Sequence, residues 1–175
     1  MSLSMDLRPH LESGGLVARQ VNPLELSPGR FAHMVRTAVE EGVRAVIIDS
    51  LTGYVASMGD EAHLSLQIHN LLTYLGEQNV TTLIVSVQHG LIGSVDTPAG
   101  YISYLADTVI LLRYYEHQGE VRRALSVFKR RAGAHERTIR DIAFASTGIS
   151  IGPPLRQFRG VLTGVPEFQQ EVEKG

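Results

Sequence analysis

The sequence contains no cysteine and only two lysines, and each scarcity removes a class of functional site. Without cysteine, disulfide bonds and thiolate metal sites are excluded. The two lysines, Lys129 and Lys174, follow Phe128 and Glu173, so the chain has no Gly-Lys pair. This excludes a phosphate-binding loop of the form G-x-x-x-x-G-K-[S/T], whose lysine and backbone amides hold nucleotide phosphates.

Long apolar runs are missing as well, and none approaches the ~20 residues that a membrane-spanning helix needs. No basic and apolar leader opens the chain, so we expect a cytoplasmic protein with no membrane partner. The 175 residues suit one domain. We interpret residues 1–4 as a cloning scar, residues 5–166 as a partial domain and residues 167–175 as a tail.

The net charge of −2 says little, but the positive charges are unevenly distributed. Half of the sixteen lysines and arginines fall within one short stretch, which has few acidic residues. A local basic excess indicates either an anionic partner or a solvated hairpin with cross-strand ion pairs. The cluster comprises Arg113, Arg122, Arg123, Lys129, Arg130, Arg131, Arg137 and Arg140.

Apolar runs alternate with helical patterns along the first two-thirds of the chain. This alternation predicts an α/β fold with a parallel sheet and right-handed crossovers. Short, fully apolar runs suit strands buried on both faces. Ser27 and Pro28 favour a helix start, and Gly42 a helix end. The expected strands are 16–21, 45–48, 82–87 and 108–115, and the expected helices 27–42 and 61–76.

After residue 115 the pattern changes to β-rich runs. Residues 122–129 and 138–144 flank a basic turn, 130–136, that contains Gly133. This predicts an antiparallel hairpin appended to the sheet. A short strand at 148–151 and an extended tail follow.

Residues 46–50, Val-Ile-Ile-Asp-Ser, have the form of a Walker B strand. A carboxylate at the carboxyl end of a buried parallel strand lies where α/β sheets bind ligands. In nucleoside triphosphatases with a phosphate-binding loop (P-loop), this aspartate helps to hold Mg²⁺. Alternatively, Asp49 only caps the next turn.

Four segments together resemble the KaiC-like ATPases of the RecA superfamily, in that family's order and spacing. They lie between Ala45 and Pro166, and residues 6–44 are also similar to the family. The segments are VIIDSLTGY, TTLIVSVQHGLIG, YLADTVILLRYYEHQGEVRRALSVFKRRAGAHERTIRDI and FRGVLTGVP.

The resemblance implies a RecA-like P-loop NTPase core, a mostly parallel sheet flanked by helices, with a C-terminal antiparallel hairpin. The P-loop strand and its helix are missing, and that strand would lie between residues 82–87 and 108–115. The family binds ATP and Mg²⁺ between subunits of a homo-oligomeric ring, and some members phosphorylate themselves or have signalling partners. We expect this chain alone to bind neither ATP nor Mg²⁺ and to be inactive as an ATPase.

The resemblance also assigns candidate site residues. Asp49 matches the Walker B position with Ser50 beside it, and Gln88 matches a phosphate-sensing position. Lys129 and Arg131 match a K-x-R pair that reaches the phosphates of a neighbouring subunit's ATP. The alternatives are that Gln88 only caps its strand and that the basic pair lies in a solvated turn.

Two other functions compete with that of an ATPase domain. A degenerate, non-catalytic assembly module could complete a partner's ATP site. A nucleic-acid-binding domain is disfavoured, because the loop 91–100 has no lysine or arginine. We do not expect clock-type phosphorylation in this chain, because Ser103-Tyr104 replaces the family's Ser-Thr pair.

We expect no metal site other than Mg²⁺ held through Asp49. The histidines that could suggest a zinc site do not have the spacing of zinc ligands; they are His63, His69, His89 and His135.

Overall fold

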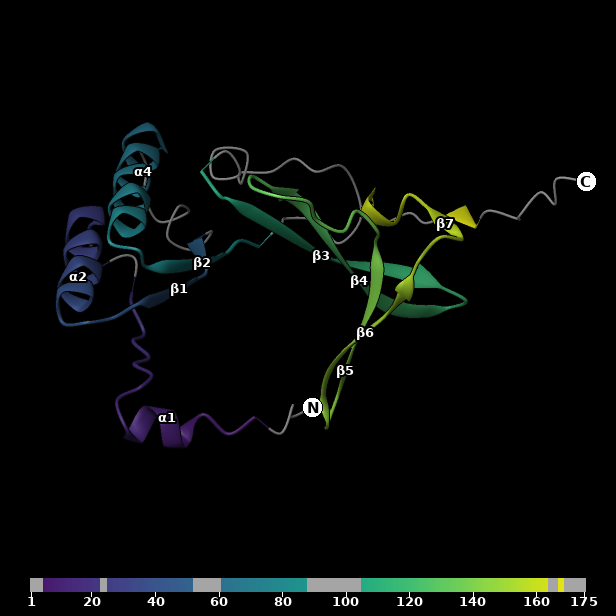
Figure 1. Cartoon of the computed structure of the whole chain (residues 1–175), viewed down its shortest axis with the longest axis horizontal. Helices are drawn as coiled ribbons and strands as arrows, with labels where there is room; N and C mark the ends of the chain where they lie inside the picture. Colours follow the sequence, from purple (N-terminus) through teal and green to yellow (C-terminus); the bar gives the residue numbers. More distant parts are fainter. Residues whose placement is uncertain (1–4, 23–24, 52–60, 88–104, 164–166, 169–175) are drawn as a thin grey trace, which may run out of the picture. The chain divides into compact units, whose positions relative to one another are not determined.

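The computed structural model describes residues 5–22, 25–51, 61–87, 105–163 and 167–168, without the side chains of residues 61–64, 163 and 168 (Figure 1). The chain forms two compact units. The helical unit contains α2 (Pro28–Glu40), β1 (Ala45–Asp49), α4 (Glu61–Glu77) and β2 (Thr81–Val85). The hairpin unit contains α1 (Arg8–Glu12) and the strands from β3 (Thr108–His117) onward.

Helix α2 (Pro28–Glu40) begins and ends where the sequence predicts. The Ser27 side chain accepts a hydrogen bond from the backbone N–H of Arg30, and Pro28 occupies the first turn. Gly42 follows the helix with φ of +107°, a backbone conformation that glycine adopts readily and residues with a side chain disfavour. The capping residues therefore fix both ends of the helix.

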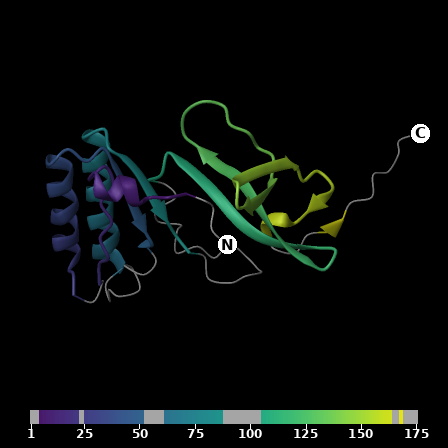
Figure 2. The same cartoon turned by 90° about the horizontal axis from the view of Figure 1, so that it is seen from below.

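Strands β1 (Ala45–Asp49) and β2 (Thr81–Val85) pair in parallel, with Ile47 opposite Leu83 and Asp49 opposite Val85. Helix α4 (Glu61–Glu77) connects back to β2 and lies beside α2. Figure 2 shows both helices on the same side of the two strands. This arrangement confirms the α/β character that the alternating pattern predicts.

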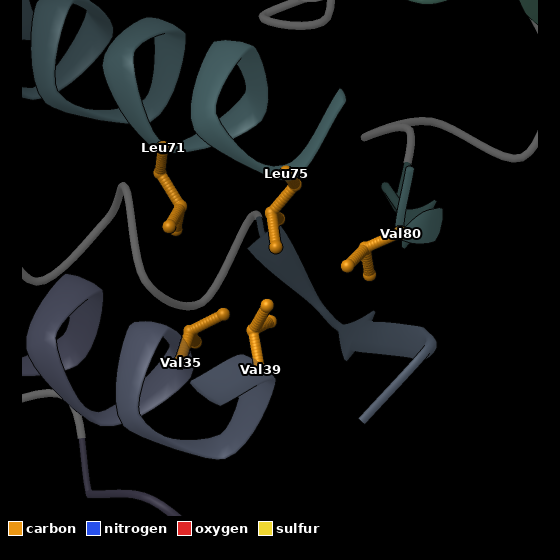
Figure 3. Close-up of a cluster of buried hydrophobic side chains, with 5 residues drawn as sticks. All are labelled: Val35, Val39, Leu71, Leu75 and Val80. Carbon is orange, nitrogen blue, oxygen red and sulfur yellow. The ribbon is translucent and has the colours of Figure 1, made fainter. Parts of the chain in front are cut away.

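The core of the helical unit lies between its helices and its sheet (Figure 3). Apolar residues at helical spacing on α2 and α4 meet there, and the half-buried Val46 of β1 packs against them. A second cluster, Leu51 and Ile68, contacts Phe31, Leu72 and Ile84. The fully buried cluster comprises Val35, Val39, Leu71, Leu75 and Val80.

The opposite face of this sheet is exposed, which corrects the prediction of strands buried on both faces. In both strands, exposed and half-buried residues alternate. Ile47 and Leu83, neighbours across the parallel pair, are 64% and 53% exposed, and Val87 is 52% exposed. None of the described elements of the helical unit covers this face. β1 and β2 therefore have the apolar composition of strands that are buried on both faces, although the described helices cover only one face of their sheet.

The hairpin unit is built on an antiparallel sheet of order β3-β4-β5-β6. Strands β3 (Thr108–His117) and β4 (Glu120–Arg130) form its longest ladder. Gln118 and Gly119, with φ of 53° and 76°, join them in a two-residue turn. Strand β5 (Arg140–Ala145) pairs with β4 through only Asp141 and Arg140, and then with β6 (Gly148–Pro154).

This sheet has a separate small core around Tyr115, Ala124 and Val161. Strands β7 (Phe158–Arg159) and β8 (Glu167–Phe168), with the 3-10 turn η1 (Val161–Thr163), complete the unit. The Phe158 ring meets the Tyr115 ring edge-on, with centroids 5.9 Å apart. The C-terminal turns therefore cover one face of the β3–β4 ladder.

Two predictions about strands differ from the structure. Residues 16–21 are not a strand, because none of the described strands pairs with them and most of their side chains are exposed. The run 108–115 was expected to be buried, yet β3 alternates between exposed and covered residues in an antiparallel sheet. Within the described residues β2 pairs only with β1 and β3 only with β4. β2 and β3 correspond to the two runs between which the missing P-loop strand is expected, and no described ladder joins them.

Candidate nucleotide site

Asp49 is the last residue of β1, at the carboxyl end of the parallel sheet, and is exposed. The peptide bond between Asp49 and Ser50 is cis. Among the described residues no ion pair or hydrogen bond engages the Asp49 carboxylate, whereas Ser50 has an interaction of its own. The parallel pairing brings the end of β2 to the same edge. Asp49 is therefore placed where a ligand at this edge could use its charge.

The third residue expected at this edge is Gln88, and it lies outside the described residues. The chain is described as far as Ser86 and Val87, which leave β2 as an exposed segment. Ser103 and Tyr104 also lie outside the described residues. The Gln88 assignment therefore stays a prediction.

Lys129 and Arg131 lie at the end of β4, in the hairpin unit. Lys129 pairs with Val109 of β3, and the backbone N–H of Arg131 donates to the carbonyl of Asp107 at 2.7 Å. The chain thus stays tied to β3 through Arg131. Lys129 and Arg131 are therefore two residues apart at the point where β4 ends.

Arg131 also forms an ion pair with Asp107, with Nη1 3.2 Å from Oδ1. Both side chains are largely exposed, at 57% and 79%. Exposed pairs of this kind contribute little to stability and are screened by salt. The Arg131 guanidinium is therefore held near the strand end but can exchange Asp107 for another anion.

The turn after β4 uses its other charges internally. Arg130 donates from Nη1 to the carbonyl of Ala134 at 3.2 Å. Arg140 pairs with Glu136, which also accepts from the Thr138 hydroxyl. The Arg140 hydrogen bond, followed by that of Thr138, lowers the pKa of Glu136. These contacts agree with the reading of the basic cluster as a hairpin with internal charge pairs, and the anionic partner stays a prediction.

A partly buried polar triad supports β4 from the covered face of the sheet. The Tyr115 hydroxyl donates to Asp141 Oδ1 at 2.8 Å, and Arg122 Nη2 donates to Oδ2 at 3.0 Å. Burial, together with the bond to Asp141, raises the pKa of Tyr115 to about 12. Sequence reasoning missed this triad, because only the strand register places Asp141 beside Tyr115.

Two further classes of site find no support in the described part of the chain. No three histidine, aspartate or glutamate side chains gather there as metal ligands. No helix in that part is long and apolar enough to cross a membrane.

Comparison with known proteins identifies close similarity to one family. The sequence profile of the KaiC ATPase matches residues 17–156. The chain is 36% identical over 109 residues to the circadian clock protein KaiC3 of Synechocystis sp., covering 61% of this chain and 22% of that protein. It is 30% identical over 121 residues to the circadian clock oscillator proteins KaiC of Thermostichus vulcanus and Synechococcus elongatus, in each case 69% of this chain and 23% of the relative. The chain therefore spans about a fifth of the length of these relatives.

Proposed function

Because the chain belongs to the KaiC family of RecA-type ATPases, we propose that it is the part of an ATPase domain that supplies two components of an ATP site between subunits. Asp49, with Ser50 beside it, supplies the Walker B carboxylate. Lys129 and Arg131 contact the phosphates of the ATP held by a neighbouring subunit of a homo-oligomer. A segment outside this chain supplies the phosphate-binding loop, which this sequence lacks.

The observation that carries this proposal is the placement of the basic pair. Lys129 and Arg131 lie two residues apart at the end of β4, and the ion pair of Arg131 with Asp107 is largely exposed. A lysine offers a point charge and an arginine a planar fork, which together suit a polyphosphate. Arginine in such a position can stabilise charge during phosphoryl transfer.

The structure of β1 is compatible with Mg²⁺ in the complete domain. Mg²⁺ prefers oxygen ligands and usually keeps several waters, so one exposed carboxylate at the strand end suffices as the protein ligand. Asp49 meets this requirement, since no described cation neutralises it. When bound with ATP, the metal would neutralise phosphate charge, and Asp49 would orient it through its carboxylate.

The test uses the complete domain, in which an upstream segment provides the phosphate-binding loop. Arg131→Ala should reduce ATP hydrolysis by about 10³-fold or more, the effect of losing an arginine that acts in trans. Arg130→Ala is the matched control, because the neighbouring Arg130 is tied to the Ala134 carbonyl of its own turn. That control should retain hydrolysis.

Mixing the Arg131→Ala protein with a variant whose phosphate-binding loop is disabled should restore part of the activity. In such a mixture, some interfaces combine an intact loop with an intact arginine. If both proteins assemble normally and no activity returns, Arg131 does not act across a subunit interface.

A second candidate function is a non-catalytic assembly module. The exposed apolar sheet face around Ile47 and Leu83 favours it, because such faces mark interaction sites. ATP hydrolysis by the complete domain separates the two candidates, since the module would be inactive even with the loop restored.

A further inference from the structure

A buried arginine in the hairpin unit has no counter-ion among the described residues. Arg113 of β3 is only 9% exposed, and its Nε and Nη2 atoms have no hydrogen-bond partner in the described part of the chain. Ser126 of β4 is 5% exposed, and its hydroxyl also lacks a partner among those residues. Buried polar groups are nearly always bonded, and an unpaired buried charge is strongly destabilising. This pair therefore requires an explanation.

The strand register places the two side chains on the same face of the sheet. Arg113 is opposite Ala124, and Ser126 is opposite Leu111, so they are diagonal neighbours across the β3–β4 ladder. In this geometry Cβ atoms are roughly 7–8 Å apart, within reach of a long side chain. One ligand group can therefore contact both.

No described acid is available to satisfy Arg113. Arg113 is opposite Ala124 of β4, and Ala124 is opposite Asp141 of β5, so Asp141 is the first acid along this row of paired residues. Its two oxygens already accept bonds from Tyr115 and Arg122. Glu116 of β3 alternates to the opposite, exposed face.

The same alternation excludes a second copy of β3 as the source of an acid. When two β3 strands pair antiparallel about a two-fold axis, residues of the same face meet. The residues that share the face of Arg113 are Val109, Leu111, Tyr115 and His117, and none is acidic. The counter-ion must come from elsewhere.

The unpaired atoms define the chemistry of the missing group. Nε and Nη2 lie along one edge of the guanidinium, the edge that binds the two oxygens of a carboxylate. Arg8 uses this edge on Asp6, with Nε 2.9 Å from Oδ1 and Nη2 3.0 Å from Oδ2. One buried cation and one neutral hydroxyl balance a single negative charge, which favours a carboxylate over a dianionic phosphate.

We propose that Arg113 and Ser126 form a binding site for one carboxylate group, with the guanidinium edge holding both oxygens and the Ser126 hydroxyl donating to one of them. Two sources share this chemistry: an acidic side chain of another polypeptide segment, and a free small carboxylate. A polypeptide has a route to the site, because no described strand occupies the second edge of β3.

The first measurement asks whether Arg113 is unpaired in the chain itself, in chloride buffer without carboxylates. Arg113→Met should leave the urea midpoint unchanged or raise it, because it removes an uncompensated charge. Arg122→Met is the matched control, since it breaks an observed ion pair and should lower the midpoint. A fall for Arg113→Met as large as that of the control would overturn the proposal.

The second measurement adds the carboxylate. Sodium formate, compared with sodium chloride at equal ionic strength, should stabilise the wild type and the Arg122→Met control. At a tenfold excess over Kd, the folded-to-unfolded ratio rises about elevenfold. Arg113→Lys keeps the positive charge but lacks the guanidinium edge that binds both oxygens, so formate should not stabilise it. This variant also replaces Arg113→Met in the comparison if Arg113→Met fails to fold.

A blocked pentapeptide, acetyl-Thr-Val-Glu-Val-Thr-amide, and its glutamine counterpart distinguish the sources. Stabilisation that depends on Arg113 and on the glutamate indicates a polypeptide carboxylate. Stabilisation by formate alone indicates a free carboxylate. If neither probe stabilises the wild type more than Arg113→Lys, the site does not bind carboxylates.

Discussion

Replacing Tyr115 by phenylalanine tests the polar triad beneath β4. The substitution keeps the ring, and with it the edge-on contact to Phe158, but removes the hydroxyl that donates to Asp141. The pKa of Tyr115 is about 12, roughly two units above the ordinary ~10 of tyrosine. At ~1.4 kcal/mol per unit this is a preference of about 3 kcal/mol for the neutral phenol over the phenolate in the folded state, and burial is its largest cause. Hydrogen bonds to charged groups typically contribute about 1.5–3 kcal/mol, so we expect a loss of about 2 kcal/mol.

The same shift predicts how the loss depends on pH. Because the native pKa is raised, the neutral phenol is favoured in the folded state. The neutral Tyr115 hydroxyl stabilises the folded state fully below pH ~10, the pKa of tyrosine in the unfolded chain. This stabilisation disappears as the pH rises through about 12, the pKa in the folded state. The stability difference between wild type and Tyr115→Phe should therefore shrink across this window.

Urea unfolding followed by circular dichroism, at steps from pH 8 to pH 11.5, measures this difference. Tyr114→Phe is the control, since Tyr114 is 48% exposed on the opposite face of β3. The control should change stability by less than ~0.5 kcal/mol. Equal losses in the two variants, or a Tyr115→Phe loss that does not change between pH 8 and pH 11.5, would refute the role given to the triad.

Two other predictions concern the whole chain. The purified chain should not hydrolyse ATP in a steady-state phosphate-release assay, because it has no Gly-Lys pair for a phosphate-binding loop. Turnover near ~1 per second, an ordinary if modest enzyme rate, would contradict this. Light scattering should show an oligomer, because exposed apolar residues and unpaired strand edges favour association, and Leu83→Lys should reduce its mass. A monomeric wild type would show that the edges and faces are satisfied within one chain.

The sequence predicted best those elements whose signals are local. Ser27 and Pro28 fix the start of helix α2 and Gly42 fixes its end, and each acts only on the adjacent turn of the helix. The apolar run before Asp49 likewise predicted β1 and the position of the aspartate at the strand end. The resemblance to the KaiC-like ATPases was confirmed by comparison.

Features that depend on distant partners could not be predicted from the same signals. Residues 16–21 have strand composition, but a strand forms only beside a partner. The run at β3 is mostly apolar, which fits burial on both faces, yet its register with β4 leaves Ile110 and Leu112 exposed. The Tyr115–Asp141 bond joins residues 26 apart, and only the sheet brings them together.

The exposed surfaces and the missing motif lead to the same conclusion about the domain. A two-stranded sheet is marginal unless further strands or helices support it, and β1 and β2 have described helices on one face only. The apolar side chains of Ile47 and Leu83 on the other face have the composition of a sheet covered on both sides. In the RecA-like arrangement that the family implies, the P-loop strand lies between the strands that correspond to β2 and β3, and its helix would cover a sheet face. We therefore expect a segment that carries the Gly-Lys pair to occupy the edge of β2 that no described strand occupies and to cover the apolar face around Ile47 and Leu83.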